Sequence, residues 1–259
     1  MIKAIAFDLW ETLITNSNKV TGTHKRLRLQ AMARILSTTP QTLEQAYRGT
    51  WDRCQELYWS ADKDISCRRQ VEHFLEALGL EGLDEPTIQS LEHAYANVAV
   101  EVLPEIVAGA DQALSDLSKR GFKLGLISNT GRTPGYALRE ILERLSLARF
   151  FEAMVFSNEH GECKPQRSIF EKLRQSLGVE FEKIVFVGDN LYADVFGAQQ
   201  CGMTAIHFAP HARGTAVAPP VDHGLTIEPH ATIGELRELS SLIDSFNAQP
   251  SEAARMRRS

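Results

Sequence analysis

Residue types suited to phosphate or leaving-group chemistry stand directly after short apolar runs of this 259-residue chain. Asp8 follows "IKAIAF", Ser128 follows "FKLGLI", and Asp189 follows "KIVFVG", while Lys164 stands in "CKPQ". A carboxylate such as Asp8 can act as a nucleophile and form a covalent acyl intermediate. A lysine ammonium can hold the charge of an anionic group. The pattern therefore predicts a hydrolytic site that handles anions.

Two of these carboxylates also predict a metal site. Asp8 and Asp189 would suit Mg²⁺, a hard cation that binds a few carboxylates together with water and substrate phosphate. Such an ion would reduce the repulsion between an anionic nucleophile and an anionic substrate. Hydroxyl groups and backbone N–H groups of neighbouring loops would bind the phosphate oxygens. We assign phosphate binding to Thr12, Ser128, Asn129, Thr130 and Lys164.

The apolar runs predict the fold that brings these residues together. They are "IKAIAF", "FKLGLI", "AMVF", "KIVFV" and "TAIHF". Near-continuous runs of this kind are typical of strands buried on both faces of a parallel sheet. Helical patterns lie between them, so we expect an α/β fold with a doubly wound parallel sheet. Because ligands of such sheets bind outside the carboxyl ends of the strands, the polar clusters should meet at that edge.

A long helical segment interrupts this alternation. Four apolar stripes at helical spacing predict four helices there, with Thr39-Pro40 starting the second, Gly79 ending the third and Asp84 starting the fourth. We expect a core and an inserted helical cap, with a last helix over residues 232–246 after a surface loop. The expected ranges are 1–15 and 101–245 for the core, 16–100 for the cap, and 246–259 for a disordered tail.

Composition narrows the class of protein. The chain is 43% hydrophobic and 24% charged, with a net charge of -5, which argues against a nucleic-acid partner. Its four cysteines form no CxxC pair, and no apolar run approaches the roughly 20 residues that span a bilayer. With no signal peptide at the N-terminus, we expect a cytoplasmic protein that acts on a small molecule without membrane contact. The oligomeric state stays open.

Four stretches together resemble the motifs of haloacid dehalogenase-like hydrolases with an α-helical cap of the first type. They are "FDLWETLI", "LISNTG", "CKPQRSIF" and "VGDNLYADVFGA", and the resemblance covers about residues 1–208. It implies Asp8 as nucleophile, with Ser128 and Lys164 as phosphate-binding and charge-stabilising groups. It also implies Mg²⁺ held by Asp189, with Asp194 in the same acidic cluster. The backbone carbonyl at position 10, which is Trp10 here, would be a further metal ligand.

Position 10 departs from the family pattern. Phosphatases of the family carry a second Asp there, which donates a proton to the leaving alcohol and later activates water. Trp10 has no group able to do either, and Glu11 stands where the family usually has Gly. Loss of a general acid typically costs about 100- to 10,000-fold in rate.

Three functions therefore stay open. The first is a Mg²⁺-dependent phosphohydrolase, acting on an activated phosphate or using Glu11 or a cap residue as the acid. The second is a 2-haloacid dehalogenase, because those relatives carry Tyr at this position and halide leaves without a proton. The third is a binding or regulatory protein on this fold, since fold alone does not establish catalysis. The intact "VGDN" favours the first, because the dehalogenases do not keep the metal-binding Gly-Asp start of that motif.

Other residues of suggestive type have plainer interpretations. Trp51, Tyr58 and Trp59 stand at helical spacing, so we expect them to pack inside the helical segment. Arg132 follows the serine motif, and we expect a solvated loop side chain.

Overall fold

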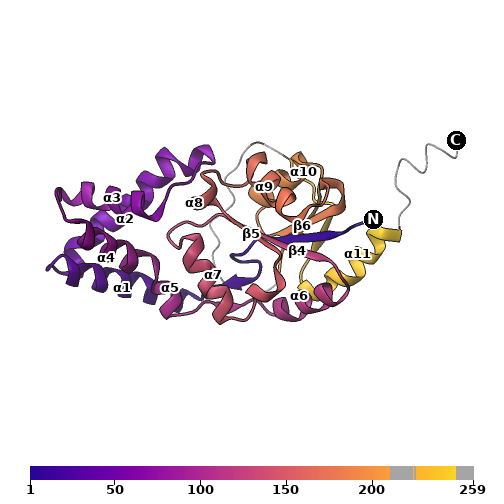
Figure 1. Cartoon of the computed structure of the whole chain (residues 1–259), viewed down its shortest axis with the longest axis horizontal. Coiled ribbons are helices and arrows are strands. Elements are labelled where there is room, and N and C mark those ends of the chain that lie inside the picture. Colours follow the sequence, from indigo (N-terminus) through magenta and orange to yellow (C-terminus); the bar gives the residue numbers. More distant parts are fainter. Residues whose placement is uncertain (211–223, 225, 249–259) are drawn as a thin grey trace.

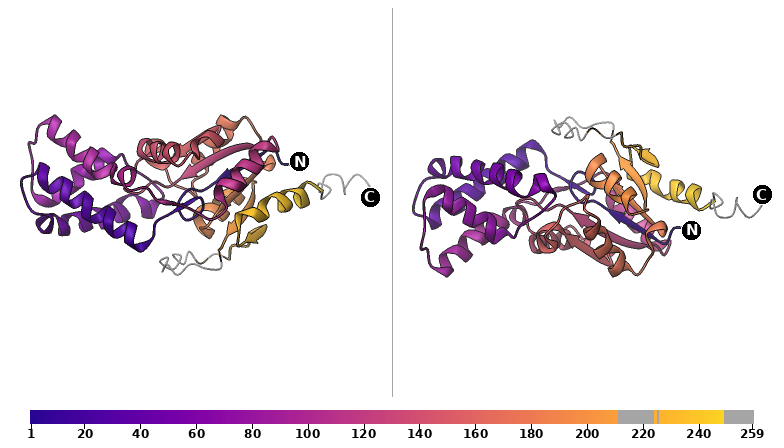
Figure 2. Two further views of the ribbon diagram at one scale, coloured as in Figure 1. Left: turned by 90° about the horizontal axis from the view of Figure 1, so that it is seen from below. Right: turned by 90° about the horizontal axis from the view of Figure 1, so that it is seen from above.

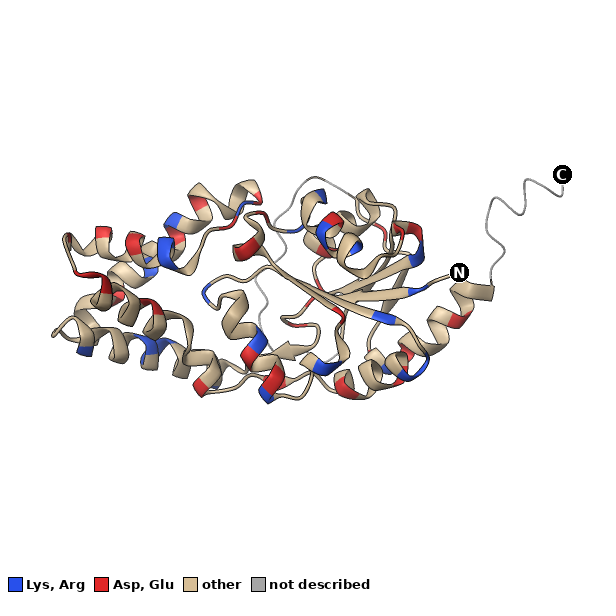
Figure 3. Ribbon diagram, in the orientation of Figure 1, with Lys and Arg blue, Asp and Glu red and all other residues tan. Residues whose placement is uncertain are grey.

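The computed structural model describes residues 1–210, 224 and 226–248. Figures 1 and 2 show an elongated molecule, with helices formed by the first hundred residues at one end and an α/β unit at the other. Lys and Arg residues are interspersed with Asp and Glu over the helices of both parts (Figure 3). Within the described residues, every helix is too short or too polar to cross a membrane.

Six parallel strands form the sheet in the order β5-β4-β1-β6-β7-β8. They are β1 (Ala4–Phe7), β4 (Lys123–Ser128), β5 (Ala153–Phe156), β6 (Ile184–Gly188), β7 (Thr204–Phe208) and β8 (Ala231–Ile233). Five of them coincide with the five apolar runs, which confirms the predicted α/β fold with a parallel sheet. Since β1 pairs with both β4 and β6, the carboxyl ends of these three strands lie side by side.

Helices cover both faces of the sheet. Alternate residues of a strand point to opposite faces, so Ile5 and Phe7 join one apolar cluster, whereas Ala4 and Ala6 join the other. The first face is covered by α6 (Ala110–Lys119), α7 (Gly135–Arg144) and α11 (Leu239–Ala248), and the second by α9 (Arg167–Leu177) and α10 (Gly197–Gln200). The strands are thus buried on both sides, which explains their near-continuous apolar sequence.

The helical part has its own apolar cluster, which includes Met32, Phe74 and Leu91. Its helices are α1 (Asn18–Ile35), α2 (Pro40–Leu57), α3 (Cys67–Leu78), α4 (Glu85–Ala96) and the short α5 (Val98–Glu101). Thr39 and Asp84 are the N-cap residues of α2 and α4, and Gly79 ends α3 in the left-handed region. The predicted starts of α2 and α4 are confirmed, because their capping side chains accept the expected backbone hydrogen bonds. The predicted end of α3 at Gly79 is confirmed by its left-handed backbone.

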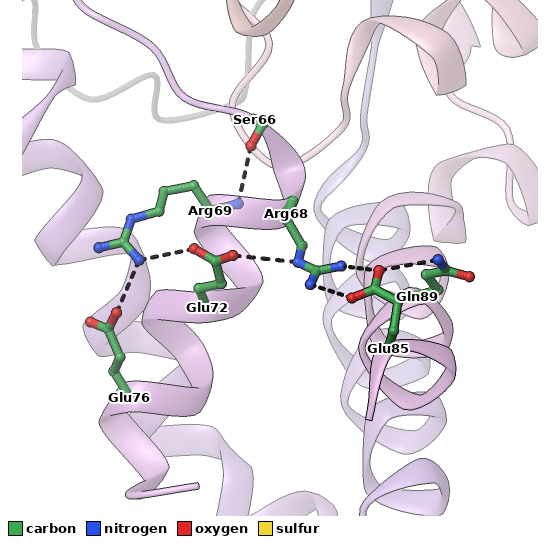
Figure 4. Close-up of polar contacts among 7 residues, drawn as sticks. All are labelled: Ser66, Arg68, Arg69, Glu72, Glu76, Glu85 and Gln89. Carbon is green, nitrogen blue, oxygen red and sulfur yellow. Dashed lines mark hydrogen bonds and ion pairs between the residues drawn. The ribbon is translucent and has the colours of Figure 1, made fainter. Parts of the chain in front are cut away.

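A surface network links α3 to α4 (Figure 4). The guanidinium of Arg68 donates to both oxygens of Glu85, at 2.7 and 2.8 Å. Arg69 donates to Glu72 at 2.9 Å and to Glu76 at 3.0 Å. Arg68 and Arg69, the two arginines of α3, therefore each have a carboxylate partner.

A two-stranded ribbon lies where the chain passes between the sheet and the helices. Its strands, β2 (Ile14–Thr15) and β3 (Glu105–Ile106), pair antiparallel. The Val107 N–H adds a hydrogen bond to the Leu13 carbonyl at 2.9 Å. The two connections are thereby tied to each other.

The C-terminal expectation is partly wrong. Residues 232–246 do not form one helix, because Thr232 and Ile233 belong to β8 and extend the sheet beyond β7. After Gly234, a 3-10 turn (Leu236–Glu238) leads into α11, which ends at Ala248, so residues 246–248 are helical rather than part of a tail. Most of the expected surface loop and residues 249–259 lie outside the described residues.

Candidate active site

The carboxyl edge of the sheet brings four separate segments of sequence together. Asp8 follows β1, Ser128 ends β4, and Asp189 follows β6. Lys164 comes from the segment between α8 (Ser157–His160) and α9. Its ammonium donates to the Ile127 carbonyl at the end of β4, at 3.0 Å.

Lys164 lies between two acidic side chains. Its Nζ is 2.6 Å from Asp8 Oδ1 and 2.7 Å from Asp194 Oδ1, and its side chain is only 1% exposed. A buried ammonium needs such partners, because an isolated buried charge is strongly disfavoured. One buried ammonium therefore forms ion pairs with two carboxylates at once.

The charges of this trio act on one another. Burial alone would lower the pKa of Lys164, but the carboxylates of Asp194 and Asp8 outweigh it and raise that pKa above its ordinary value. Burial also raises the pKa of Asp8, to about 6, with Lys164 opposing and Asp194 adding to the rise. The lysine therefore stays charged, and Asp8 depends on a nearby positive charge to remain a carboxylate.

Three carboxylates of this site are spaced to share a cation. Oxygen atoms of Asp8, Asp189 and Asp194 all lie within 4.8 Å of one another. Gly188 makes room for this cluster, because a Cβ at that position would lie 2.3 Å from Asp194 Oδ2. The same oxygen accepts the Asn190 N–H at 3.0 Å, which fixes its orientation. A set of carboxylate oxygens around a small space fits Mg²⁺.

A tight turn follows the candidate nucleophile. The Leu9 carbonyl accepts the N–H groups of Leu13 and Ile14, and Glu11 adopts a positive φ of 60°. Within the described part of the chain, the buried Thr12 hydroxyl has no hydrogen-bond partner. A buried hydroxyl of this kind can bond to a ligand oxygen, and phosphate binding by Thr12 stays a prediction.

The substitutions at positions 10 and 11 have different surroundings. The Trp10 side chain is half-buried and lines a cleft beside the turn. Both carboxylate oxygens of Glu11 lie 2.9 Å from the Thr15 hydroxyl, which donates to them. Glu11 therefore contacts the β2 strand at the base of the ribbon.

The segment after β4 only partly meets the expectation of a phosphate-binding loop. Ser128 is fully buried, and among the described residues its hydroxyl makes only a 3.4 Å contact with the Asn129 carbonyl. The Asn129 amide holds the backbone of Lys164, accepting its N–H at 2.9 Å and donating to its carbonyl at 3.1 Å. The Thr130 N–H donates to Ser157 Oγ at 2.9 Å, so the expectation that this N–H binds phosphate does not hold in this structure.

Asp64 is a residue that sequence reasoning missed. It lies between α2 and α3, is 7% exposed, and accepts hydrogen bonds from Trp59, Ser157 and Thr130. Its backbone N–H donates to the Gly161 carbonyl at 3.0 Å. Asp64 therefore ties the helical part to the loops around Lys164, and nothing in its local sequence distinguishes it from a solvated turn residue.

Two clefts open between the helical part and the sheet edge. One, of about 440 Å³, is lined by Trp10, Tyr47 and Arg132 among others, and the second, of about 340 Å³, by Trp59, Asp64 and Lys164. Trp51 and the Asn129–Gly131 segment line both clefts. The second cleft reaches the lysine, and the first begins at the turn that carries Asp8.

Trp51 and Arg132 do not match their plain interpretations. Trp51 is 39% exposed and lines both clefts instead of packing inside the helical part. The Arg132 guanidinium stacks on Tyr47 and Trp51, with its central carbon 4.2 and 4.5 Å from the ring centroids. The spacing of aromatic residues in a helix does not reveal which rings face a cleft. The surroundings of Trp51 and Arg132 could therefore be seen only in the tertiary structure.

Comparison with known proteins agrees with this geometry. A family model described as haloacid dehalogenase-like hydrolase matches residues 2–202. The chain belongs to this hydrolase family, which confirms the family resemblance seen in its motifs. The chain is also 31% identical to a glyceraldehyde 3-phosphate phosphatase of Pyrococcus abyssi over 208 residues, 80% of this chain and 82% of that one.

Solved structures share the fold. A 2-haloacid dehalogenase from Pseudomonas syringae superimposes with a TM-score of 0.69 and 24% identity, over 95% of this chain and 100% of that one. A HAD phosphatase from Thermococcus onnurineus gives a TM-score of 0.61 and 21% identity, over 93% and 98% of the two chains. Proteins named as a dehalogenase and as a phosphatase thus share this fold. The fold alone does not distinguish the two reactions, so the residues of the site must distinguish them.

Proposed function

We propose that this hydrolase is a Mg²⁺-dependent phosphohydrolase of a small phosphorylated molecule, with Asp8 as the nucleophile. The observation that carries the proposal is the buried Lys164 ammonium between Asp8 and Asp194, beside the three-carboxylate cluster. An arrangement with one cation and room for a second suits a substrate that brings several negative charges. The similarity to chains named glyceraldehyde 3-phosphate phosphatase supports phosphoester hydrolysis.

The reaction would proceed in two displacements. A carboxylate oxygen of Asp8 attacks phosphorus, and the bond from phosphorus to the leaving oxygen breaks, with its electron pair going to that oxygen. Water then attacks the aspartyl phosphate, releasing phosphate and restoring the Asp8 carboxylate. Lys164 stays charged throughout and would stabilise the phosphoryl oxygens together with Ser128 and Thr12.

Four residues would hold the metal. We assign it to Asp8, Asp189 and Asp194 together with the backbone carbonyl of Trp10. Mg²⁺, when bound, would neutralise charge between the nucleophile and the phosphoryl group. The carboxylates supply hard oxygen ligands, and the carbonyl of residue 10 does not depend on the indole side chain.

The missing acid at position 10 restricts the substrate. The indole N–H of Trp10 is far too weak an acid to protonate the leaving oxygen, and Glu11 contacts Thr15. The carboxylate of the cap residue Asp64 accepts hydrogen bonds from N–H and O–H donors on both sides of the cap contact, so it acts as an acceptor that ties the cap in place. We therefore expect the best substrates to have leaving groups that are stable as anions.

A second candidate, hydrolysis of a carbon–halogen bond, draws its support from Trp10, because halide needs no acid. The deciding experiment compares phosphate release from p-nitrophenyl phosphate, with Mg²⁺ and with a chelator, against halide release from 2-chloropropionate without metal. Phosphate release that requires Mg²⁺ supports our proposal. Halide release without metal, or no turnover of any phosphate ester, overturns it.

A further inference from the structure

The 440 Å³ cleft beside Trp10 has an unusual charge balance. Lys25, Arg28 and Arg132 line it, and the described residues that line it include no Asp or Glu. Lys25 is neutralised by an ion pair with Glu44. His24 also lines the cleft, but burial lowers its pKa, so it is neutral near pH 7. The positive charge of the cleft therefore rests on Arg28 and Arg132.

Arg28 is a buried cation with neutral partners only. It is 5% exposed, and its Nε donates to the Tyr95 carbonyl at 2.5 Å, while Nη1 donates to the Tyr47 hydroxyl at 2.8 Å. Its central guanidinium carbon lies 5.5 Å from the Tyr95 ring centroid. These contacts orient the guanidinium, but among the described residues no carboxylate pairs with it. A buried charge without a counter-charge is costly, so its presence calls for an anion.

Arg132 contacts the same two tyrosines and also lines the cleft. Its Nε donates to the Tyr95 hydroxyl at 3.2 Å and its Nη2 to the Tyr47 carbonyl at 3.1 Å. Within the described chain it too has no carboxylate partner. Two like charges held around the same two tyrosines repel each other, and a bound anion would relieve that repulsion.

The arginines of the outer cap surface show the contrast. Arg68 and Arg69 each contact carboxylates of α3 or α4 (Figure 4). Arg28 of the cleft is more buried than either, yet among the described residues neither cleft arginine has such a partner. A guanidinium held by neutral acceptors keeps its remaining N–H groups for a carboxylate or phosphate, whose paired oxygens match its planar fork.

We propose that this cleft binds a second anionic group of the substrate, a carboxylate or another phosphate, at the end remote from the phosphate attacked by Asp8. The inference rests on the proposed function for the position of the attacked phosphate. Trp10 links the two places, because it is two residues from Asp8 and lines the cleft. The side chain that replaces the acid thus forms a wall of the pocket. The preferred substrates are doubly anionic in the sense that they carry a second anionic group besides the attacked phosphate.

Binding to the full-length Asp8→Asn variant in Mg²⁺ tests this inference without turnover. Calorimetry would compare two matched pairs, 3-phosphoglycerate with glycerol 3-phosphate, and fructose 1,6-bisphosphate with fructose 1-phosphate. Two charge-assisted hydrogen bonds predict about 10- to 100-fold tighter binding of the doubly anionic member in at least one pair. The responding pair shows whether the cleft takes a carboxylate or a phosphate.

Arg132→Gln, added to that variant, should remove the preference for the doubly anionic member. The matched control is Arg26→Gln, which removes the same charge from the exposed face of α1 and should keep the preference. Equal affinities within both pairs, or an equal loss for both members in the Arg132 variant, would overturn the inference. Discrimination in a protein that hydrolyses no phosphate ester would refute the proposed reaction while supporting the anion site.

Discussion

The Nζ of Lys164 lies 2.6 Å from Asp8 Oδ1, although the two residues are 156 positions apart in sequence. The contact exists because β1 lies beside β4 in the sheet and the Asn129 amide holds the backbone of Lys164 in place. Lys164 also pairs with Asp194, so one buried cation serves two acids. We therefore expect Lys164 to contribute to the stability of the folded protein as well as to the proposed reaction.

Replacing Lys164 by Gln should destabilise the protein. Asp8 and Asp194 would then face each other in a buried site without their cation, and breaking a buried pair costs about 3–5 kcal/mol. Denaturant unfolding would measure the loss. Added Mg²⁺ should restore part of it, because the ion supplies positive charge to the same carboxylates.

The exposed Lys172 of α9 provides the control for that experiment. Lys172→Gln should change the free energy of unfolding by less than about 0.5 kcal/mol, as is usual for surface substitutions. Equal stabilities of the Lys164 and Lys172 variants would show that the central ion pairs do not operate in solution.

Replacing Trp10 by Asp should change the substrate range. A carboxylic acid at this position can protonate a poor leaving group, so hydrolysis of alkyl phosphates should rise relative to aryl phosphates. We expect the ratio of the two kcat/KM values to increase about tenfold or more, short of the roughly 100- to 10,000-fold of a well-placed acid. Trp10→Asn opens the same space without an acid and should leave the ratio as it is. A similar increase in both variants would assign the effect to space rather than to proton transfer.

Replacing Asp64 by Asn should loosen the contact between the cap and the sheet edge. The amide would bring its own N–H groups toward the Ser157 and Thr130 hydroxyls, which now donate to the carboxylate. Leaving buried polar groups unsatisfied costs about 1–3 kcal/mol, and hydrogen exchange should quicken near Thr130. Asp52→Asn, at an exposed site of α2, is the comparison. An Asp64 variant as stable and as protected as this one would rule out the anchoring role.

His24 predicts a pH dependence of stability. Burial lowers its pKa below 6.5, and Arg28 acts in the same direction, while a hydrogen bond to the Val102 carbonyl opposes them. The unfolded chain therefore takes up a proton first as the pH falls, so stability should be lost from about pH 6.5 downward.

His24→Gln should remove this part of the pH dependence, since Gln can donate to the same carbonyl without titrating. Between pH 7 and 5, the free energy of unfolding of the natural protein should fall more steeply, by at most about 1.4 kcal/mol per pH unit for one proton. Parallel curves for the two proteins would contradict the assignment.

Local sequence patterns were sufficient for five of the six strands of the described sheet and for several helix ends. The five apolar runs predict strands because both faces of the sheet are covered, and Thr39 and Asp84 mark helix starts through their own hydrogen bonds. β8 was missed because Thr232 and Ile233 give too short a signal, and pairing with β7 decides their conformation.

The site shows the same division. The meeting of Asp8 with Ser128 and Asp189 at one edge was predictable, because the strands that they follow or end are parallel. Lys164 joins them from the segment between α8 and α9, as its family motif implies. The meeting of Arg28 with Arg132 was not predictable, since they are 104 positions apart and only the packing around Tyr47 and Tyr95 brings them together. Even within a motif, the sequence did not predict the partner of the Thr130 N–H, because the acceptor, Ser157, comes from another element.

The most direct test of the account is Mg²⁺-dependent phosphate release by the natural protein and by Asp8→Asn, purified in parallel. The variant keeps the shape of the side chain but loses the nucleophilic carboxylate, and nucleophile loss in comparable sites reduces the rate by several orders of magnitude. We predict hydrolysis of p-nitrophenyl phosphate by the natural protein and a loss of about 1,000-fold or more in the variant. Equal rates for the two proteins would contradict the assignment of Asp8 and with it the proposed mechanism.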